Sequence, residues 1–362
     1  MSLISRKVLP FALGISGLAL AGCSEAPPEQ TGPATPVGET IEIVAPLGLP
    51  PVPIPADNPP TSETIALGRR LYYDPALSSD NTIACANCHR PDAGFGDPDP
   101  FSSGVGGQKG GRQSPTVLNA AYFDVQFWDG RAASLEEQAR GPVANPVEMA
   151  NTLEAVEHML AADPSYVAEF EAAWGPGPIT YEKVEKSIAS FERSVIAGNS
   201  PFDRFMYGGE ADALSESAKR GLEVFRDAKK GNCAVCHEIG EEYALFTDNK
   251  FHNLGVGAEI DGTLADQGRH DVTKNDADRG AFKTPSLRNI AQTAPYMHDG
   301  SLKTLKEVVD FYIGAGNSND WRDKEIRELD HLTGEERADL EAFMESLTGE
   351  LPDNVGRPQI GP

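Results

Sequence analysis

The stretch Cys85-Ala86-Asn87-Cys88-His89 decides how this chain folds, and a second copy of the pattern stands at Cys233-Ala234-Val235-Cys236-His237. Cys-x-x-Cys-His is the attachment signature of c-type haem. The two thiols bond covalently to the macrocycle, and the adjacent imidazole is placed to bind the iron from one face. Because the chain has only 5 cysteines, two complete matches predict two covalently held haems, with His89 and His237 as iron ligands.

The alternative for the two Cys-x-x-Cys pairs is a zinc site built from both of them. Each pair, however, carries the following histidine, and structural zinc sites usually set their ligands closer together in sequence. The haem interpretation is therefore favoured.

Length and composition indicate a globular protein with room for two domains. A chain of 362 residues can bury two sizeable cores, and its 40% hydrophobic and 24% charged content is ordinary. The formal net charge is -24. This charge argues against nucleic acid as a partner, because a phosphate surface needs a basic patch. It favours an encounter with a basic or locally basic redox protein.

Residues 1–22 have the pattern of a lipoprotein signal peptide. Arg6 and Lys7 precede an apolar run, residues 8–21, that is too short for a comfortable membrane-spanning helix. The run ends in Leu20-Ala21-Gly22-Cys23, which resembles a bacterial lipobox and predicts cleavage before Cys23 and lipid attachment to its thiol. The alternative is an ordinary secretory signal with a chance cysteine. Both predict export, and we expect a periplasmic protein anchored to the membrane through the lipid alone.

The rest of the chain is predicted to be mainly α. Residues 23–60 are Pro-rich and are expected to form an extended tether, residues 61–205 and 206–348 two cytochrome c-type domains, and residues 349–362 a C-terminal tail. Helical patterns occur at Ser62–Tyr73, Ser134–Arg140, 151–162, 164–174, 180–197, Ser215–Ala228, Leu302–Ile313 and Thr333–Leu347, with a break at Asn199-Ser200-Pro201. Residues 90–127 and 238–283 are expected to be irregular, and no long strand is indicated.

The two halves of the chain repeat each other at an offset of 170 residues. The matching segments are Ser114-Pro115-Thr116-Val117-Leu118-Asn119 with Thr284-Pro285-Ser286-Leu287-Arg288-Asn289, Asp129-Gly130 with Asp299-Gly300, and Leu135-Glu136-Glu137 with Leu305-Lys306-Glu307. One offset shared by three segments predicts a single cytochrome c module used twice.

The second ligand of each iron decides the function. A haem iron with two protein ligands passes electrons, whereas one with an open face can bind a small molecule. Residues 90–127 contain no His and no Met. Beyond His237 the candidates are His252, His270, Met297, His298, Tyr312 and His331. The repeat pairs Tyr312 with Pro142, which cannot bind iron, and so favours an open first iron and a second one closed by Tyr312. The alternative for Tyr312 is a core aromatic residue at the end of its helix.

These residues resemble the bacterial dihaem cytochrome c peroxidase family, which includes the MauG-type enzymes that mature a tryptophan-derived quinone cofactor. The resemblance covers about residues 61–348. Besides both haem motifs, it rests on Gln108-Lys109-Gly110-Gly111-Arg112-Gln113-Ser114-Pro115-Thr116, Phe127-Trp128-Asp129-Gly130-Arg131, Pro146-Val147-Glu148-Met149, Phe282-Lys283-Thr284-Pro285 and Tyr296-Met297-His298-Asp299-Gly300. Together these motifs are highly specific.

The resemblance implies a peroxidatic N-terminal haem and a C-terminal haem that takes in electrons, with Trp128 between them. It implies that Gln138 and Glu148 line the peroxide site. Glu148 would be the acid/base that moves a proton across the O–O bond, and Gln138 would position peroxide or its water. Without the resemblance, Glu148 is a charge at a helix start, Gln138 a surface amide and Trp128 a core residue.

The chain departs from the standard peroxidases of the family at two ligand positions. Where they have a His sixteen residues beyond the first haem His, Val105 stands here, which suggests an iron that is open at rest. Where they ligate the second iron with Met, Tyr312 stands here, as in the MauG-type enzymes, which also have a proline at the place of Pro142. Met297 is the fallback ligand. An anionic phenolate favours ferric iron.

The resemblance also implies a calcium ion between the domains. Its matching positions are Gln113, Thr293 and Pro295, with Gln113 in place of an asparagine; calcium accepts an amide oxygen from either residue.

The sequence thus predicts a dihaem c-type peroxidase. It would reduce hydrogen peroxide at the open N-terminal haem with electrons delivered through the C-terminal haem from a small cytochrome c or cupredoxin. One alternative is a MauG-like enzyme that uses a high-valent dihaem state to oxidise Trp or Tyr of a partner protein, and another is a dihaem electron carrier. Family members are often dimers, so a homodimer is an open expectation.

Overall fold

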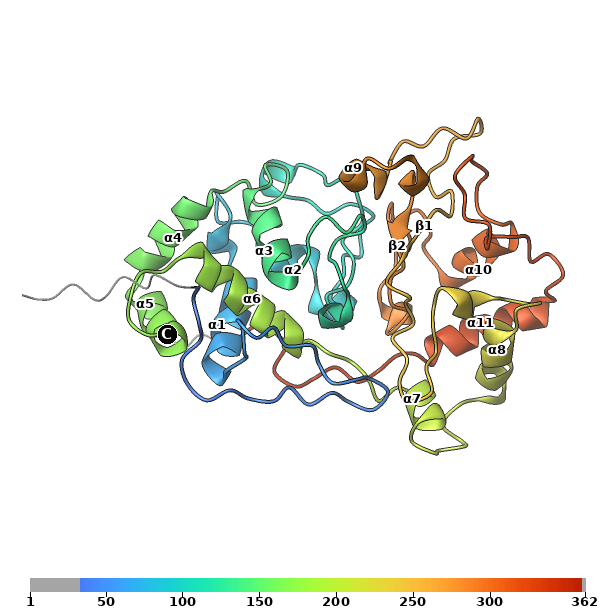
Figure 1. Ribbon diagram of the computed structural model, residues 1–362, viewed down its shortest axis with the longest axis horizontal. Helices are drawn as coiled ribbons and strands as arrows, with labels where there is room; N and C mark the ends of the chain where they lie inside the picture. Colours follow the sequence, from blue (N-terminus) through green and yellow to red (C-terminus); the bar gives the residue numbers. More distant parts are fainter. Residues whose placement is uncertain (1–32, 360–362) are drawn as a thin grey trace, which may run out of the picture.

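The computed structural model describes residues 33–359, which form two helical lobes side by side along the long axis (Figure 1). The predicted signal peptide, residues 1–22, and the predicted lipid attachment site Cys23 lie outside the described residues. No helix in the described part of the chain is long and apolar enough to cross a membrane.

The N-terminal lobe consists of α1 to α6. Their bounds are Ser62–Tyr72, Cys85–Cys88, Leu135–Ala144, Leu153–Ala162, Pro164–Trp174 and Tyr181–Ser194. α1 crosses α6 so closely that a Cβ on Gly68 would lie 1.8 Å from the carbonyl oxygen of Ser187. A glycine is therefore required at this crossing of α1 and α6.

The C-terminal lobe repeats that crossing. It contains α7 to α11, with bounds Pro201–Met206, Glu216–Arg226, His270–Thr273, Leu305–Ile313 and Gly334–Glu345, and a two-stranded antiparallel ladder of β1, Phe251–His252, and β2, Phe282–Lys283. α8 crosses α11, and a Cβ on Gly221 would lie 1.9 Å from the carbonyl oxygen of Asp339. The two lobes thus use the same helix pair in the same way.

The loops repeat as well. Asn119 and Asn289 both have a left-handed backbone, with φ of 62° and 58°, and Phe127 and Met297 have φ of 67° and 70°. Each of the latter two sits in a turn closed by an isolated bridge, Gln126 to Ala132 in one lobe and Tyr296 to Leu302 in the other. The offset of 170 residues holds for all of these pairs, so the repeat seen in the sequence is also a structural repeat.

The predicted fold class is confirmed, since helices dominate and the two strands are only 2 residues each. All eight predicted helices form, most within three residues of the expected bounds; α3 runs on to Ala144. α7 was not expected, because Asn199-Ser200-Pro201 was interpreted only as a break. Ser200 in fact caps this helix and Pro201 opens it, a start signal that the sequence does carry.

Residues 33–60, here called the N-terminal strap, are extended but do not form a free tether. The strap begins on the N-terminal lobe, where the N–H of Ala34 donates to Glu182 at 3.0 Å, and reaches the C-terminal lobe at Gly48, whose carbonyl accepts from Arg288 at 2.5 Å. Arg288 also pairs with Asp203, and both side chains are almost fully buried. The expected tether over residues 23–60 is therefore wrong for residues 33–60.

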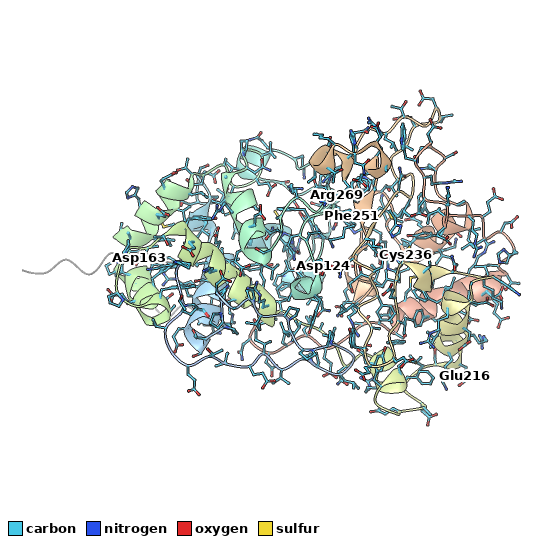
Figure 2. All side chains as sticks on the ribbon, in the orientation of Figure 1. Asp124, Asp163, Glu216, Cys236, Phe251 and Arg269 are labelled. Atoms are coloured by element: carbon cyan, nitrogen blue, oxygen red, sulfur yellow. The ribbon has the colours of Figure 1, made fainter. Side chains whose placement is uncertain are left out.

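Two further connections join the lobes. The end of the chain returns from α11 to the N-terminal lobe, where the carbonyl of Val355 accepts from the hydroxyl of Tyr73 at 2.7 Å; Figure 1 shows this red segment and the blue strap along the lower edge. Above them, Arg269 lies over the ring of Phe251 at 4.4 Å and donates to the carbonyl of Asp129 at 2.8 Å (Figure 2). The lobes are therefore joined both along the lower edge and above it.

Candidate functional site

The two Cys-x-x-Cys-His stretches form two short helical turns. The first is α2, and the second is a 3₁₀ turn at Cys233–Val235. In both, the N–H of the histidine donates to the carbonyl of the first cysteine, at 2.9 Å for His89 and 3.0 Å for His237. Each histidine and its two cysteines line one cavity. Because the two pairs line separate cavities, a single zinc site built from both pairs is excluded.

Both histidine rings are fixed through one nitrogen. Nδ1 of His89 lies 2.9 Å from the carbonyl oxygen of Pro115, and Nδ1 of His237 lies 2.9 Å from that of Phe246. A carbonyl can only accept, so Nδ1 donates its proton and Nε2 keeps a lone pair for iron. Burial lowers the pKa of both imidazoles and keeps them neutral. Two thiols and a neutral ring on one large cavity fit covalently attached haem at each site.

The first cavity, of about 420 Å³, gathers the predicted catalytic residues. It is lined by Cys85, Cys88 and His89 and by Trp128, Gln138, Pro142 and Glu148. Gln138 and Pro142 lie one turn apart on α3, so they share its inner face. Met149 also touches the cavity, but it is 2% exposed and packs in the apolar core of the lobe. Val105 does not line the cavity.

Glu148 is held in a tight turn. Nδ2 of Asn145 donates to its Oε1 at 2.6 Å, and the N–H of Val105 donates to its backbone carbonyl at 2.8 Å. Burial raises the pKa of the Glu148 carboxyl, while the hydrogen bond from Asn145 opposes the rise. A carboxyl group at a cavity wall whose pKa is raised holds a proton more readily than a free carboxyl, which suits a group that accepts and returns a proton.

Trp128 lies between the two cavities and lines both of them. Its indole N–H donates to the carbonyl of Gln113 at 2.9 Å, and its own carbonyl accepts from the N–H of Lys283 at 2.8 Å. The N–H of Gln113 in turn donates to the carbonyl of His298. The indole is therefore held by the N-terminal lobe, and the backbone of the same residue by the C-terminal lobe.

The second cavity holds both predicted alternatives for the second iron, Tyr312 and Met297. Tyr312 lies on α10 and lines the same cavity as His237. Burial raises the pKa of its phenol, and its hydroxyl makes no hydrogen bond to any described residue. A phenol oxygen that faces a cavity without a partner is available for a metal ion. Pro142 and Tyr312 lie at matching places on the matching helices α3 and α10.

The four other histidines that were candidate ligands of the second iron divide into two groups. His252 and His298 line the second cavity. The two ring nitrogens of His252 lie 2.5 and 3.0 Å from carboxylate oxygens of Asp323 and Asp248. The ring of His298 stacks on that of Phe282, with the ring centres 3.6 Å apart. The other two, His270 and His331, are near the surface and bond to backbone carbonyls.

The three predicted calcium positions lie on the wall of the second cavity, since Gln113, Thr293 and Pro295 all line it. The amide Nε2 of Gln113 donates to the carbonyl of Asp97 at 3.1 Å. The amide is thereby oriented by a protein contact and keeps its oxygen for another partner.

Sequence reasoning missed two polar residues of the first cavity. Asn145 stands three residues before Glu148, a spacing typical of a side chain that bonds within its own turn, so a signal for it was present. Glu192 lines the cavity from α6, is 5% exposed, and has an Oε2 atom with no hydrogen-bond partner among the described residues. Its place within a helical pattern offered no signal that it would stay unpaired.

Comparison with known proteins agrees with this geometry. Residues 62–211 match the family model described as di-haem cytochrome c peroxidase. The chain is 39% identical over 310 residues to a methylamine utilization protein MauG of Methylorubrum extorquens, covering 85% of this chain and 84% of the relative. It is 36% identical over 376 residues to a cytochrome-c peroxidase IdrP1 of a Pseudomonas species, covering 96% and 94%.

Among solved structures, the fold matches that of a MauG-like protein associated with microbial copper homeostasis. The TM-score is 0.77 at 33% sequence identity, and the match covers 86% of this chain and 96% of the other. The predicted resemblance is thus confirmed. The chain belongs to the dihaem cytochrome c peroxidase family, which includes MauG, and is an oxidoreductase whose two Cys-x-x-Cys-His sites correspond to two c-type haems.

Proposed function

We propose that this protein reduces hydrogen peroxide to water at the open face of the first haem. The observation that carries the proposal is the asymmetry of the two cavities. Pro142 stands where the second cavity has Tyr312, and Gln138 and Glu148 line the same wall as Pro142. Among the described residues, the first cavity therefore has proton-handling groups and a proline at the place where the second cavity has a phenol.

Glu148 moves the proton. Its carboxylate would accept a proton from hydrogen peroxide in the first cavity and return it to the oxygen that leaves as water. The bound haem supplies the metal site for peroxide and the first electrons for the cleavage. Two electrons and two protons per peroxide balance the reaction to two waters. Gln138 holds peroxide or its water by hydrogen bonds.

Asn145 keeps the Glu148 carboxyl aimed into the cavity through the 2.6 Å hydrogen bond. Trp128 lines both cavities and would therefore lie on the path of electrons between haems held at His237 and His89. The donor is a small cytochrome c or cupredoxin with a basic surface, because the net charge of the chain is -24.

A second candidate function is favoured by Tyr312. A phenolate ligand stabilises the more oxidised states of iron, which suits an enzyme that oxidises Trp or Tyr of a partner protein. The relative named MauG supports this candidate, and the relative named cytochrome-c peroxidase supports the first. A pure electron carrier is disfavoured, because it has no use for Glu148 and Gln138 beside an open iron.

The deciding experiment is a resting-state EPR and optical spectrum of the holoprotein and of Tyr312→Phe. We expect one high-spin haem at rest and a second haem whose spectrum changes in the variant. The matched control is Tyr296→Phe, since Tyr296 lines the same cavity but donates to the carbonyl of Ile290. Two low-spin haems and an unchanged Tyr312→Phe spectrum would show that the ligand assignment is wrong, and Met297 would then be the ligand to test.

Turnover separates the two enzymatic candidates. Peroxide consumption coupled to oxidation of a reduced small cytochrome supports the peroxidase. Slow turnover combined with oxidation of a Trp or Tyr of a co-purified protein supports the modifying enzyme.

Three finer features belong to the proposal. The protein is exported to the periplasm and held there by a lipid on Cys23. It binds one calcium ion through Gln113 and the backbone carbonyls of Thr293 and Pro295. The third feature is a homodimer. Mass spectrometry of the mature N-terminus tests the lipid anchor, metal analysis of the holoprotein tests the calcium ion, and sedimentation of the holoprotein tests the homodimer.

A further inference from the structure

A buried carboxyl group without a role in the reaction above lies at the wall of the first cavity. Glu192 of α6 lines this cavity together with Ile188, one turn earlier. Its Oε2 is shielded from solvent and has no hydrogen-bond partner in the part of the chain that the structure describes. Buried polar atoms are nearly always hydrogen-bonded, so an unpartnered one at a cavity wall points to a partner inside the cavity.

The charges around Glu192 do not neutralise it. Its neighbour Arg193 is committed to Glu136 of α3, with nitrogen–oxygen distances of 2.7 and 3.0 Å. Tyr72 of α1 and Cys85 of α2 are the other titratable groups that sense its charge, and Cys85 becomes an uncharged thioether once haem is attached. Burial raises the pKa of Glu192 to about 8, and Glu136 adds to the rise while Arg193 opposes it.

The second cavity has no such group at the matching place. The two helix crossings meet at Ser187 and at Asp339, as described above. Counting five residues onward along each helix gives Glu192 in the N-terminal lobe and Met344 in the C-terminal lobe, and Met344 lines the second cavity. The carboxyl is therefore specific to the cavity proposed to carry out the chemistry, although the helices around it are repeated.

We propose that Glu192 is the proton acceptor coupled to reduction of the first haem. When haem held at His89 gains one electron from the donor, the Glu192 carboxylate would take up one proton from solvent and become the neutral acid. On oxidation the electron leaves the iron and the proton leaves the carboxyl. The net charge of the cavity then stays constant through the cycle. The inference requires haem at His89 but no turnover of peroxide, so it can hold or fail separately from the proposed function.

The physical reason is electrostatic. Charges in a buried cavity interact more strongly than in water, because the surroundings screen them less. The oxidised iron carries one more positive charge and lowers the pKa of a nearby carboxyl; reduction lets that pKa rise. Between the two pKa values the reduction potential falls as pH rises, by up to about 59 mV per pH unit, the one-electron equivalent of a tenfold change in an equilibrium constant.

The test is a spectroelectrochemical titration of both haems in the holoprotein across the pH range around the pKa of Glu192. In the native protein we expect the potential of the first haem to fall with pH. In Glu192→Gln, which has the same shape and cannot ionise, that slope should become clearly shallower, with the remainder due to Glu148 of the same cavity, while the pH dependence of the second haem stays as it was. Glu185→Gln is the matched control, because Glu185 is a buried glutamate of the same helix that is already paired with Arg140.

An unchanged slope in Glu192→Gln overturns the proposal, as does a slope lost equally in Glu185→Gln. If Glu192→Gln fails to load haem, the native holoprotein still decides the matter. Its reduced-minus-oxidised infrared spectrum should contain a protonated-carboxyl C=O band that grows with reduction of the first haem, and the absence of this band near the pKa of Glu192 rules the coupling out.

Discussion

Nδ2 of Asn145 lies 2.6 Å from Oε1 of Glu148, at the wall of the first cavity. This hydrogen bond stabilises the ionised carboxylate and so lowers its pKa, against the rise caused by burial. Peroxide reduction needs the carboxylate form to accept the first proton, so the rate is expected to increase as pH rises through the pKa of Glu148.

Asn145→Ala should therefore move the acidic limb of the pH profile of kcat/KM to higher pH. A hydrogen bond to a charged group is worth about 1.5–3 kcal/mol, which corresponds to a shift of about one to two pH units. Gln108→Ala is the control, because Gln108 donates to the carbonyl of Pro146 in the same turn without touching the carboxyl. An acidic limb that stays in place in Asn145→Ala would mean that Asn145 does not set the protonation of Glu148.

Glu148→Gln should reduce peroxide turnover by about 10²–10⁴-fold, the usual contribution of a positioned acid/base. The optical spectra of both haems should be unchanged, because Glu148 is not an iron ligand in this proposal. The measurement is steady-state peroxide reduction with a reduced small cytochrome as electron donor. Glu154→Gln is the control, because Glu154 is exposed on α4. A loss of less than tenfold would remove Glu148 from the proton transfer.

Gly221→Ala should destabilise the C-terminal lobe. A Cβ at this position would lie 1.9 Å from the carbonyl oxygen of Asp339, so α8 and α11 must move apart. Overpacking of this kind costs about 1–3 kcal/mol in the free energy of unfolding, measured by denaturant titration. Gly334→Ala in α11 is the control, since nothing lies within 4 Å of its Cβ position. Equal stability of the two variants would contradict the close crossing.

Arg288→Ala should loosen the N-terminal strap. The variant leaves Asp203 buried without its partner, which costs about 3–5 kcal/mol, and removes the hydrogen bond to the carbonyl of Gly48. We expect faster proteolytic cleavage within residues 33–60. Mass spectrometry of the fragments over time measures the cleavage rate. Lys306→Ala, which breaks an exposed ion pair with Asp310, should leave the cleavage rate unchanged.

Much of this architecture follows from local sequence patterns. The two haem motifs, the helical periodicities and the 170-residue repeat need only short stretches of chain, and Tyr312 of α10 lies at the place that matches Pro142 of α3, as the repeat predicts. The N-terminal strap could not be predicted in this way. Its proline-rich composition resembles that of a linker. The groups that hold it are far away in sequence: Glu182 is 148 residues from Ala34, and Arg288 is 240 residues from Gly48.

Glu192 was missed for a related reason. A glutamate in an amphipathic helix is ordinarily paired or solvated, as Glu185 and Glu136 are paired with Arg140 and Arg193. Which acid remains without a cation depends on how three helices meet. Local pattern alone carries no such information.

The N-terminal strap crosses from the N-terminal lobe to the C-terminal lobe and back, and the returning C-terminal segment crosses to the N-terminal lobe beside it. The strap runs from Ala34 to Gly48 and the returning segment from Leu347 to Val355, each anchored on both lobes. Electron tunnelling falls off steeply with the gap between donor and acceptor. These two segments prevent the lobes from separating and so fix the distance between the two haem sites. The rate of electron transfer between the haems should therefore depend on driving force and hardly at all on solvent viscosity.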